Sequence, residues 1–284
     1  MSKKNKIRLI IALLAILLLA AALDCRLVVR YYTVEAEAIT QPVRLALLTD
    51  LHSCRYGENE EELIAALNAQ QPDIVLLVGD IFDDKIPDDN TAAFLQSIAG
   101  QYPCYYVTGN HEYWAGTEAF NAKMAILAEY GVQRLAGNTD CVTVNGQTLN
   151  ICGVDDIDSY RVIPNADQSD GLDIFNQQLK DVSPDQYNNL NYTILLAHRP
   201  GFFISYTVAG FDLAVCGHAH GGQWRIPGLI NGVYEPNQGL FPKYAGGIYQ
   251  QDGTTMIVSR GLARESTRIP RIFNRPELVI IDLK

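Results

Sequence analysis

Apolar and polar residues alternate in blocks along most of this chain. From residue 43 onward, short runs rich in Val, Ile, Leu and Tyr are separated by Gly, Pro, Asn and Asp. Runs of this length and composition, bounded by turn residues, are typical of buried β-strands. We therefore expect strands at residues 43–49, 73–78, 104–108, 149–154, 193–197, 213–216, 255–259 and 278–283.

Longer amphipathic stretches lie between these runs and predict helices. In the first stretch, Leu63, Ile64 and Leu67 share one face behind an acidic first turn, and the third stops at Gly131, a favourable C-terminal cap. We expect helices at residues 60–70, 91–99, 117–130 and 172–180. Strands that alternate with helices indicate a layered α/β fold. Because the sequence shows no repeat or internal linker, we expect one domain over residues 43–284.

The N-terminal segment has a different pattern. Basic residues precede an unbroken Ala/Ile/Leu run from residue 9 to 23, which is apolar on every face and so favours a membrane over a core. At about 1.5 Å per residue the run spans roughly 22 Å, which fits a cleaved signal peptide or a short membrane anchor. The basic cluster predicts a cytoplasmic N-terminus, with the rest of the chain on the extracytoplasmic side. Residues 1–42 are assigned to this segment and a connector.

The net charge and the cysteine spacing limit which partners and which kinds of site this chain can have. The formal net charge of −10 repels a phosphate backbone, so we expect no nucleic-acid partner. Bound divalent cations would reverse the local sign, so this charge does not exclude a smaller phosphate substrate. The six cysteines lack zinc-site spacing. A turn at Asn145-Gly146 places Cys152 diagonal to Cys141, a poor disulfide geometry, and we expect mostly free thiols.

Polar side chains follow five of the predicted strands at the point where each strand ends. The segments are Asp50-Leu51-His52, Gly79-Asp80-Ile81-Phe82-Asp83, Gly109-Asn110-His111-Glu112, His198 and Gly217-His218-Ala219-His220. All five histidines of the chain lie in these segments, whereas structural histidines would be scattered. In an open α/β sheet, ligands bind at the carboxyl ends of the strands, so these side chains should meet at one rim.

This set of residue types suits a pair of divalent metal ions. Two cations a few ångströms apart repel each other, and a shared carboxylate offsets that repulsion, with Asp80 as the natural bridge. Imidazoles mixed with carboxylates favour Mn, Fe or Zn, whereas an all-carboxylate cage would favour Mg or Ca. The glycines before Asp80, Asn110 and His218 let the backbone turn sharply off each strand.

In this order the five segments resemble the calcineurin-like metallophosphoesterase superfamily. Gly221-Gly222-Gln223, Ser259-Arg260-Gly261 and residues 271–283 further resemble its membrane-associated branch, typified by the phosphodiesterases YkuE and YaeI. The resemblance implies a four-layer αββα sandwich with a dimetal site above the central strands. That branch also includes enzymes that cut the pyrophosphate of a lipid-linked nucleotide sugar.

The resemblance also implies a role for each residue. Asp50, His52 and His220 would bind the first metal, Asn110, His198 and His218 would bind the second, and Asp80 would bridge both. His111 would stand beside the leaving group without binding metal, and Asn110 would also help to position the phosphate. Asp83 or Glu112 would orient His111, although the family usually has Asp where this chain has Glu112.

These residues predict hydrolysis of a phosphate ester by metal-activated water. The N-terminal segment favours a phosphodiesterase or pyrophosphatase acting on a membrane-lipid or cell-envelope substrate. A phosphomonoesterase or protein phosphatase and a non-catalytic metal-binding protein are the alternatives, and the missing HExxH motif argues against a metalloprotease. Arg55, Arg260 and Arg264 could clamp phosphate or form surface ion pairs. Tyr113 and Trp114 could line a substrate groove or simply pack.

Overall fold

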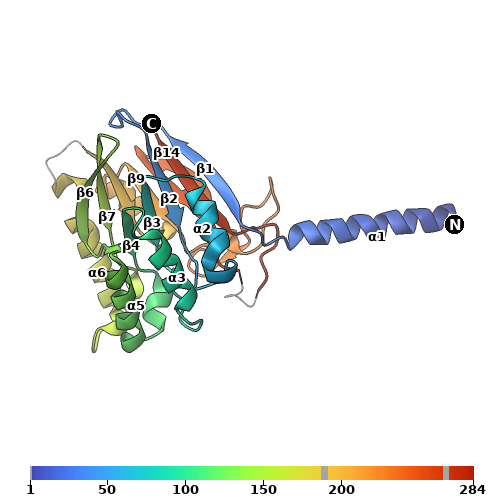
Figure 1. The fold of residues 1–284 in the computed structure, drawn as a ribbon, viewed down its shortest axis with the longest axis horizontal. Coiled ribbons are helices and arrows are strands. Elements are labelled where there is room, and N and C mark those ends of the chain that lie inside the picture. Colours follow the sequence, from blue (N-terminus) through green and yellow to red (C-terminus); the bar gives the residue numbers. More distant parts are fainter. Residues whose placement is uncertain (1, 187–190, 265–268) are drawn as a thin grey trace.

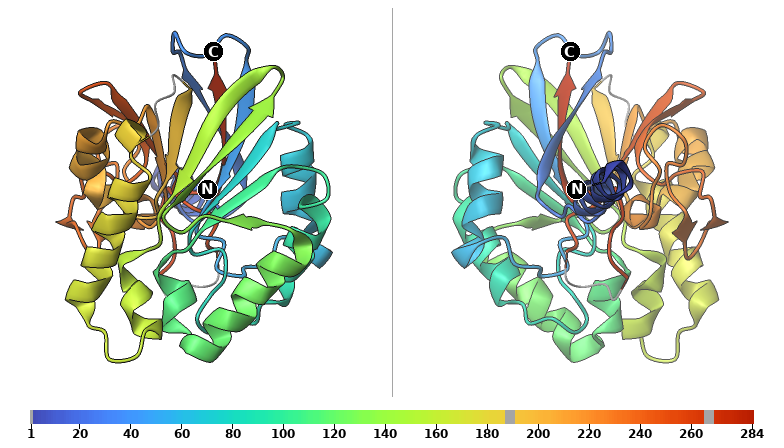
Figure 2. Two further views of the ribbon diagram at one scale, coloured as in Figure 1. Left: turned by 90° about the vertical axis from the view of Figure 1, so that its left-hand side faces the viewer. Right: turned by 90° about the vertical axis from the view of Figure 1, so that its right-hand side faces the viewer.

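The computed structural model describes residues 2–186, 191–264 and 269–284 of the chain. Two six-stranded sheets pack face to face at its centre (Figure 1 and Figure 2). The first sheet has the order β1 (Val28–Val34), β14 (Glu277–Leu283), β2 (Val43–Leu48), β3 (Ile74–Val78), β4 (Cys104–Val107) and β5 (Gln133–Arg134). The second has the order β12 (Gly247–Gln251), β13 (Thr254–Val258), β9 (Leu213–Cys216), β8 (Tyr192–Leu196), β7 (Gln147–Gly153) and β6 (Asn138–Val144).

Helices cover the outer face of each sheet. The first sheet carries α2 (Glu61–Asn68), α3 (Asp89–Ile98) and α5 (Thr117–Tyr130), and the second carries α6 (Gln168–Asp181) and α7 (Phe203–Ala209). Figure 2 shows these helices on the two outer sides with both sheets between them. The arrangement confirms the predicted four-layer αββα sandwich.

Side-chain alternation along β2 explains the layering. Successive side chains of a strand point to opposite faces of its sheet. Leu45 and Leu47 enter the core between the two sheets, whereas Ala46 and Leu48 pack against the helices. Because both faces are covered, the strand is a continuous apolar run, which is why it could be recognised in the sequence.

The predicted strands and helices all form, with bounds that shift by a few residues. Helix α5 has the predicted bounds, whereas α6 begins earlier, after Asp167, whose side chain caps it. The hairpin of β6 and β7 has the expected register, with Cys141 opposite Asn150. All six cysteines are free thiols.

The predicted connector differs, because residues 28–34 form strand β1. This strand pairs in parallel with β14, with Val28 opposite Glu277 and Val34 opposite Leu283. It lies at the edge of the first sheet, where several of its side chains are partly or fully exposed. The strand therefore lacks the apolar run by which the buried strands were recognised.

Helix α1 (Lys3–Ala22) projects away from the sandwich (Figure 1). It begins after the capping residue Ser2, so it includes the basic residues as well as the apolar run. Its 20 residues span about 30 Å, the thickness of a typical hydrocarbon core. Within the described parts of the chain it is the one helix long and apolar enough to cross a membrane.

Candidate metal centre

The carboxyl ends of five strands bring the predicted site residues to one edge of the sandwich. Asp50 and His52 follow β2, and Asp80 follows β3. From the second sheet, His198 follows β8, and His220 begins a short 3-10 turn after β9. Because β2, β3 and β4 are parallel neighbours, as are β8 and β9, their following loops emerge on the same side.

Four of these side chains form a first donor group, consisting of Asp50, His52, Asp80 and His220. One nitrogen or oxygen atom from each lies within 4.8 Å of the others. The Nε2 atoms of His52 and His220 are 3.4 Å apart, and His220 Nε2 lies 3.6 Å from Asp50 Oδ1. A mixed nitrogen and oxygen set of this kind suits Mn, Fe or Zn.

A second donor group consists of Asp80, His198 and His218. His198 Nε2 lies 3.2 Å from Asp80 Oδ2 and 3.3 Å from His218 Nδ1. The same Oδ2 atom is 3.7 Å from His52 Nε2 in the first group. Asp80 therefore belongs to both groups, which is the position expected of a bridging carboxylate.

Buried polar atoms without partners show that a cation fits here. Asn110 is 2% exposed, and within the described residues its Oδ1 atom has no hydrogen-bond partner. It precedes His111, whose backbone N–H donates to Asp80 Oδ1 at 2.8 Å, so the Asn110 backbone lies close to the shared carboxylate. A buried amide oxygen without a partner is costly unless positive charge is bound nearby.

The carboxylates make this site attractive to positive charge. Burial by itself lowers the pKa of His198, but Asp80 and Asp50 outweigh that effect and raise the pKa to about 10. The same competition, with Asp80 as the largest opposing charge, raises the pKa of His111 to about 9. At His220 burial prevails and lowers the pKa to about 3, which keeps this imidazole neutral and able to bind metal.

Five of the predicted ligands have left-handed backbone conformations. The φ angles are 51° at Asp50, 50° at His52, 51° at Asp80, 65° at His218 and 45° at His220. For residues other than glycine such conformations cost about 1–3 kcal/mol each and cluster at functional sites. A neighbouring glycine is required for a different reason, because a Cβ atom on Gly109 would lie 2.2 Å from Asp80 Oδ1.

Neighbouring groups fix the orientation of two histidines. His198 donates from Nδ1 to the Val78 carbonyl at 2.9 Å, which leaves Nε2 free to face Asp80. His218 Nε2 lies 2.7 Å from Asn237 Oδ1 and 3.2 Å from Glu235 Oε1. Glu235 ends the short strand β10 (Tyr234–Glu235), and Asn237 lies in the turn that leads to β11 (Gly239–Leu240). They were not predicted, because no motif marks this hairpin.

His111 lies at the start of helix α4 (Asn110–Trp114) and is oriented by an aspartate that was not predicted. Its Nδ1 atom is 2.7 Å from Asp84 Oδ1 and 3.5 Å from Asp83 Oδ2. Asp83 Oδ2 is closer to His52 Nδ1, at 3.1 Å. Asp84 directly follows the predicted segment, so only its position next to Asp83 could have indicated it.

Glu112 differs from the expectation that it orients His111. Its carboxylate accepts hydrogen bonds from the backbone N–H groups of Gly109 at 2.8 Å and of Asp80 and Phe82 at 3.1 Å. Glu112 is fully buried, and these amide donors satisfy its charge. The residue therefore ties the loop after β3 to the loop after β4 and holds Asp80 in place.

Comparison with protein families decides the assignment. The family model of the calcineurin-like phosphoesterases matches residues 43–222, which include every predicted metal ligand. The chain belongs to the calcineurin-like phosphoesterase family. The resemblance inferred from the sequence motifs is thereby confirmed.

Curated relatives of this chain include several bacterial proteins and a bovine one. The chain is 28% identical to an uncharacterized metallophosphoesterase of Campylobacter jejuni over 265 residues, 90% of this chain and 63% of that protein. It is 25% identical to the phosphodiesterase YaeI of Escherichia coli, covering 85% of this chain and 82% of YaeI. It is 30% identical to a bovine (Bos taurus) transmembrane protein with a metallophosphoesterase domain, covering 78% and 48%. The chain thus spans less than two thirds of the Campylobacter protein and about half of the bovine one.

A solved structure with the same fold is a dimetal phosphatase from Danio rerio. The TM-score is 0.51 with 11% sequence identity, and the similarity covers 78% of this chain and 88% of that one. At this identity the similarity supports the calcineurin-like fold alone.

The arginines proposed as phosphate clamps are engaged elsewhere. Arg260 forms a buried ion pair with Glu277, with Nη1 and Oε2 3.0 Å apart. Arg264 lies over the ring of Tyr56, and Arg55 donates to the Gly57 carbonyl. In the structure these three arginines thus contact neighbouring groups of the chain itself.

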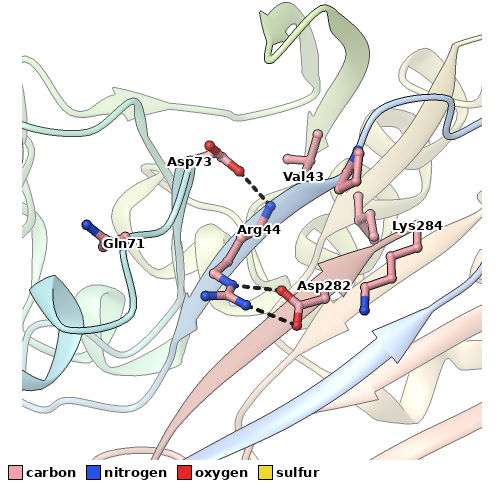
Figure 3. Close-up of a pocket in the computed structure, with 8 residues that line it drawn as sticks. Val43, Arg44, Gln71, Asp73, Asp282 and Lys284 are labelled. Atoms are coloured by element: carbon pink, nitrogen blue, oxygen red, sulfur yellow. Dashed lines mark hydrogen bonds and ion pairs between the residues drawn. The ribbon is translucent and has the colours of Figure 1, made fainter.

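Two pockets lie at opposite ends of the sheets. A cavity of about 270 Å³ adjoins the metal centre and is lined by His218, Arg199, Phe202, Glu235 and Asn237, among others. A second pocket, of about 280 Å³, lies at the amino end of β2 and contains no histidine (Figure 3). The first pocket is therefore the candidate substrate site.

Of the two aromatic residues that follow His111, one is buried and the other is exposed. Tyr113 is buried and stacks on Phe120. Trp114 is 46% exposed, its ring centroid lies 4.5 Å from that of His111, and its indole N–H donates to Asp158. Tyr113 therefore packs in the interior, whereas Trp114 is exposed beside His111.

Proposed function

We propose that this protein is a dimetal-dependent phosphodiesterase or pyrophosphatase that acts on a membrane-lipid or cell-envelope substrate. The observation that carries the hydrolase assignment is the sharing of Asp80 between two donor groups. Asp80 Oδ2 lies 3.2 Å from His198 Nε2 and 3.7 Å from His52 Nε2. A carboxylate between two sets of imidazoles suits a pair of divalent cations.

The predicted ligands account for both cation positions. Asp50, His52 and His220 would hold one ion, Asn110, His198 and His218 would hold the other, and Asp80 would contact both. Divalent cations at such a pair supply a nucleophile from water at neutral pH and neutralise charge on the phosphoryl oxygens. The remaining side chains of the site then orient the ester and handle the leaving group.

His111 would act on the leaving oxygen. Asp84 at 2.7 Å from Nδ1 fixes the ring and makes Nε2 the nitrogen that can meet a substrate oxygen. A proton delivered to the leaving oxygen is worth about 10²–10⁴-fold in rate. Trp114, exposed beside the His111 ring, offers an apolar surface for the group that departs.

The charge balance at the rim favours a diester over a monoester. Arg199, which lines the adjoining cavity, is paired with Asp156 at 2.6 Å, and Arg260 is paired with Glu277. Arginines already neutralised by carboxylates leave less positive charge for a doubly charged monoester. The single charge of a diester suits this arrangement better, and the E. coli relative is named a phosphodiesterase.

The exposed apolar helix α1 favours a substrate at a membrane. Leu13, in the middle of the helix, is 56% exposed, which is unfavourable in water and favourable in lipid. The bovine relative is named a transmembrane protein. Anchoring through α1 would bring the metal centre near lipids and envelope polymers that carry phosphate esters.

A substrate comparison on full-length protein in mild detergent tests this function. We expect bound divalent metal and chelator-sensitive hydrolysis of bis-p-nitrophenyl phosphate. The diester should exceed p-nitrophenyl phosphate by about tenfold or more in kcat/KM, a difference of about 1.4 kcal/mol in transition-state binding. A preference for the monoester would favour the phosphomonoesterase alternative. Metal binding without hydrolysis of these esters, lipid phosphodiesters or lipid-linked pyrophosphates would favour a binding protein.

A further inference from the structure

A loop near the base of α1 is apolar although it is exposed. Residues 224–230 read Trp-Arg-Ile-Pro-Gly-Leu-Ile and include no acidic residue. Leu229 is 79% exposed, Ile226 is 48% exposed and Trp224 is 45% exposed. Exposed apolar side chains gathered in one short segment mark a surface that meets a partner.

Backbone contacts close this loop into a compact projection. Ile226 and Ile230 form an antiparallel bridge, with hydrogen bonds of 3.0 and 2.8 Å between them. Arg225 Nε donates to the Asn231 carbonyl at 3.0 Å. Leu229 lies within the turn that this bridge closes, so its side chain is held outward at the tip.

The loop is connected to α1 through one intermediate segment, residues 269–273. The Arg225 N–H donates to the Ile272 carbonyl at 3.0 Å. The next residue, Phe273, donates from its N–H to the Ala22 carbonyl in the last turn of α1, at 2.7 Å. Figure 1 shows the corresponding orange and red-brown loops around the end of α1, on the side from which the helix projects.

The charge of this region also suits a membrane surface. Residues 224–234 and 269–276 contain three arginines and no carboxylate, in a chain with a formal net charge of −10, although Arg271 is buried. Arg26, at the base of α1, is 81% exposed at its side chain, and both Arg26 and Arg275 pair with Asp24. The exposed apolar side chains therefore support a membrane contact more strongly than the charge does. Basic groups beside exposed aromatic and aliphatic side chains are typical of segments at a lipid interface.

We propose that loop 224–230, together with Ile269, enters the surface of the lipid bilayer that holds α1. This inference rests on the proposed anchoring of α1. The helix provides one attachment and the loop a second, which fixes the orientation of the domain. Ile269 is 56% exposed and adjoins the loop, because the indole N–H of Trp224 donates to the Pro270 carbonyl at 3.0 Å.

The second attachment places the metal centre at the membrane surface. His220 lies four residues before Trp224. Asn274, next to Phe273, donates from its side chain to the His220 carbonyl at 2.7 Å. The ligand loop and the membrane loop are thus held together. The substrate class that fits is an amphiphile whose phosphate lies at the depth of the lipid headgroups.

The two tryptophans of the chain allow a direct test. In full-length protein, Trp114→Phe leaves Trp224 as the single fluorophore, and Trp224→Phe leaves Trp114. Each variant is reconstituted into phosphatidylcholine and phosphatidylglycerol vesicles, with or without bromine on the acyl carbons near the headgroup. We expect Trp224 to lose most of its emission to brominated lipid and Trp114 to retain most of its emission.

A charge at the tip of the loop sharpens this test. Leu229→Asp, added to Trp114→Phe, should strongly reduce the quenching of Trp224, because a carboxylate enters lipid at high cost. The matched control is Val208→Asp on α7, which is 83% exposed. Helix α7 packs beside α6, at the end of the domain away from α1 in Figure 1. The control should leave quenching unchanged, and both variants should unfold at the wild-type temperature.

Flotation of full-length protein with the vesicles separates the anchor from the loop. Suppose that the protein floats with the vesicles but that aqueous iodide, and not brominated lipid, quenches Trp224. That result would overturn the loop inference and leave the anchor inference intact. Protection of Trp224 from both quenchers would mean that protein, such as a second copy of the chain, covers the loop, and would also overturn it. Failure to float would overturn anchor and loop together. Hydrolysis of bis-p-nitrophenyl phosphate by the wild-type protein on the same vesicles reports the proposed function independently.

Discussion

Strand β2 has charged side chains near both of its ends, and their surroundings differ. At the amino end, Arg44 Nε lies 2.7 Å from Asp282 Oδ1, and the Arg44 N–H donates to Asp73 at 2.7 Å (Figure 3). At the carboxyl end, Asp50 and Asp80 lie together and are fully buried among imidazoles.

The comparison separates charges that stabilise a fold from charges that await a ligand. In the Figure 3 pocket each carboxylate has an arginine or amide donor from the chain itself, and the groups are partly exposed to water. At the metal centre, buried acids lie close to each other, and the Asn110 oxygen lacks a partner among the described residues. Polar groups left in that state cost free energy that a bound cation would recover.

The largest effect is expected at the shared carboxylate. Asp80→Asn removes one negative charge between the two donor groups, so metal content should fall and kcat/KM should drop by about 10³-fold or more. Asp282→Asn makes the same chemical change in the Figure 3 pocket and should leave activity near wild type. Steady-state kinetics and metal analysis measure both. Full activity in metal-loaded Asp80→Asn would contradict the bridging role.

An intermediate effect is expected beside the metals. His111→Ala should lower kcat by about 10²–10⁴-fold while metal content stays nearly intact, because its ring faces Asp84 at 2.7 Å and lies outside the two donor groups that share Asp80. His111 does form a third donor group with His52 and Asp83, so the metal analysis tests its role directly. Kinetics and elemental analysis of the same preparation distinguish these outcomes. Loss of both metals would show that His111 is a ligand instead.

The smallest effect is expected at the amino end of β2. The Arg44 side chain is 40% exposed and that of Asp282 is 21% exposed, so their pair should contribute only about 0–1 kcal/mol to the free energy of unfolding. Urea unfolding of Arg44→Ala, Asp282→Ala and the double variant measures the coupling. Hydrolysis should be unchanged in all three, and a large loss of activity would mean that this pocket takes part in function.

The buried part of the fold could be predicted because covered strands must be apolar on both faces. Strands such as β3, which is buried along its whole length, are therefore visible as runs. The edge strands β1 and β12 have partly exposed faces, so their sequences resemble loops. The register of β6 with β7 was predictable because Asn145-Gly146 specifies the turn.

The candidate site likewise contains residues that the sequence predicted and residues that it did not. The predicted ligands could be recognised because metal chemistry restricts residue type and strand ends restrict position. Asp84, Glu235 and Asn237 support histidines, a task that many polar residues can perform from any nearby loop, so no pattern marks them. The contacts of Glu112 depend on the rotamer of its side chain, and the neighbouring residues in the sequence do not determine that rotamer.

The left-handed ligand residues make the metal centre inseparable from its scaffold. Asp50 and His52 keep their strained φ angles because their backbone N–H groups are held by the carbonyls of Gly79 and Asp80, at 3.0 and 2.9 Å, in the loop after the neighbouring strand. If the same Asp-x-His residues were placed in an ordinary surface loop, their backbone would adopt unstrained φ angles, and their metal-binding atoms would move apart. Short ligand motifs of this kind can therefore be inherited with the sandwich but not transplanted without it.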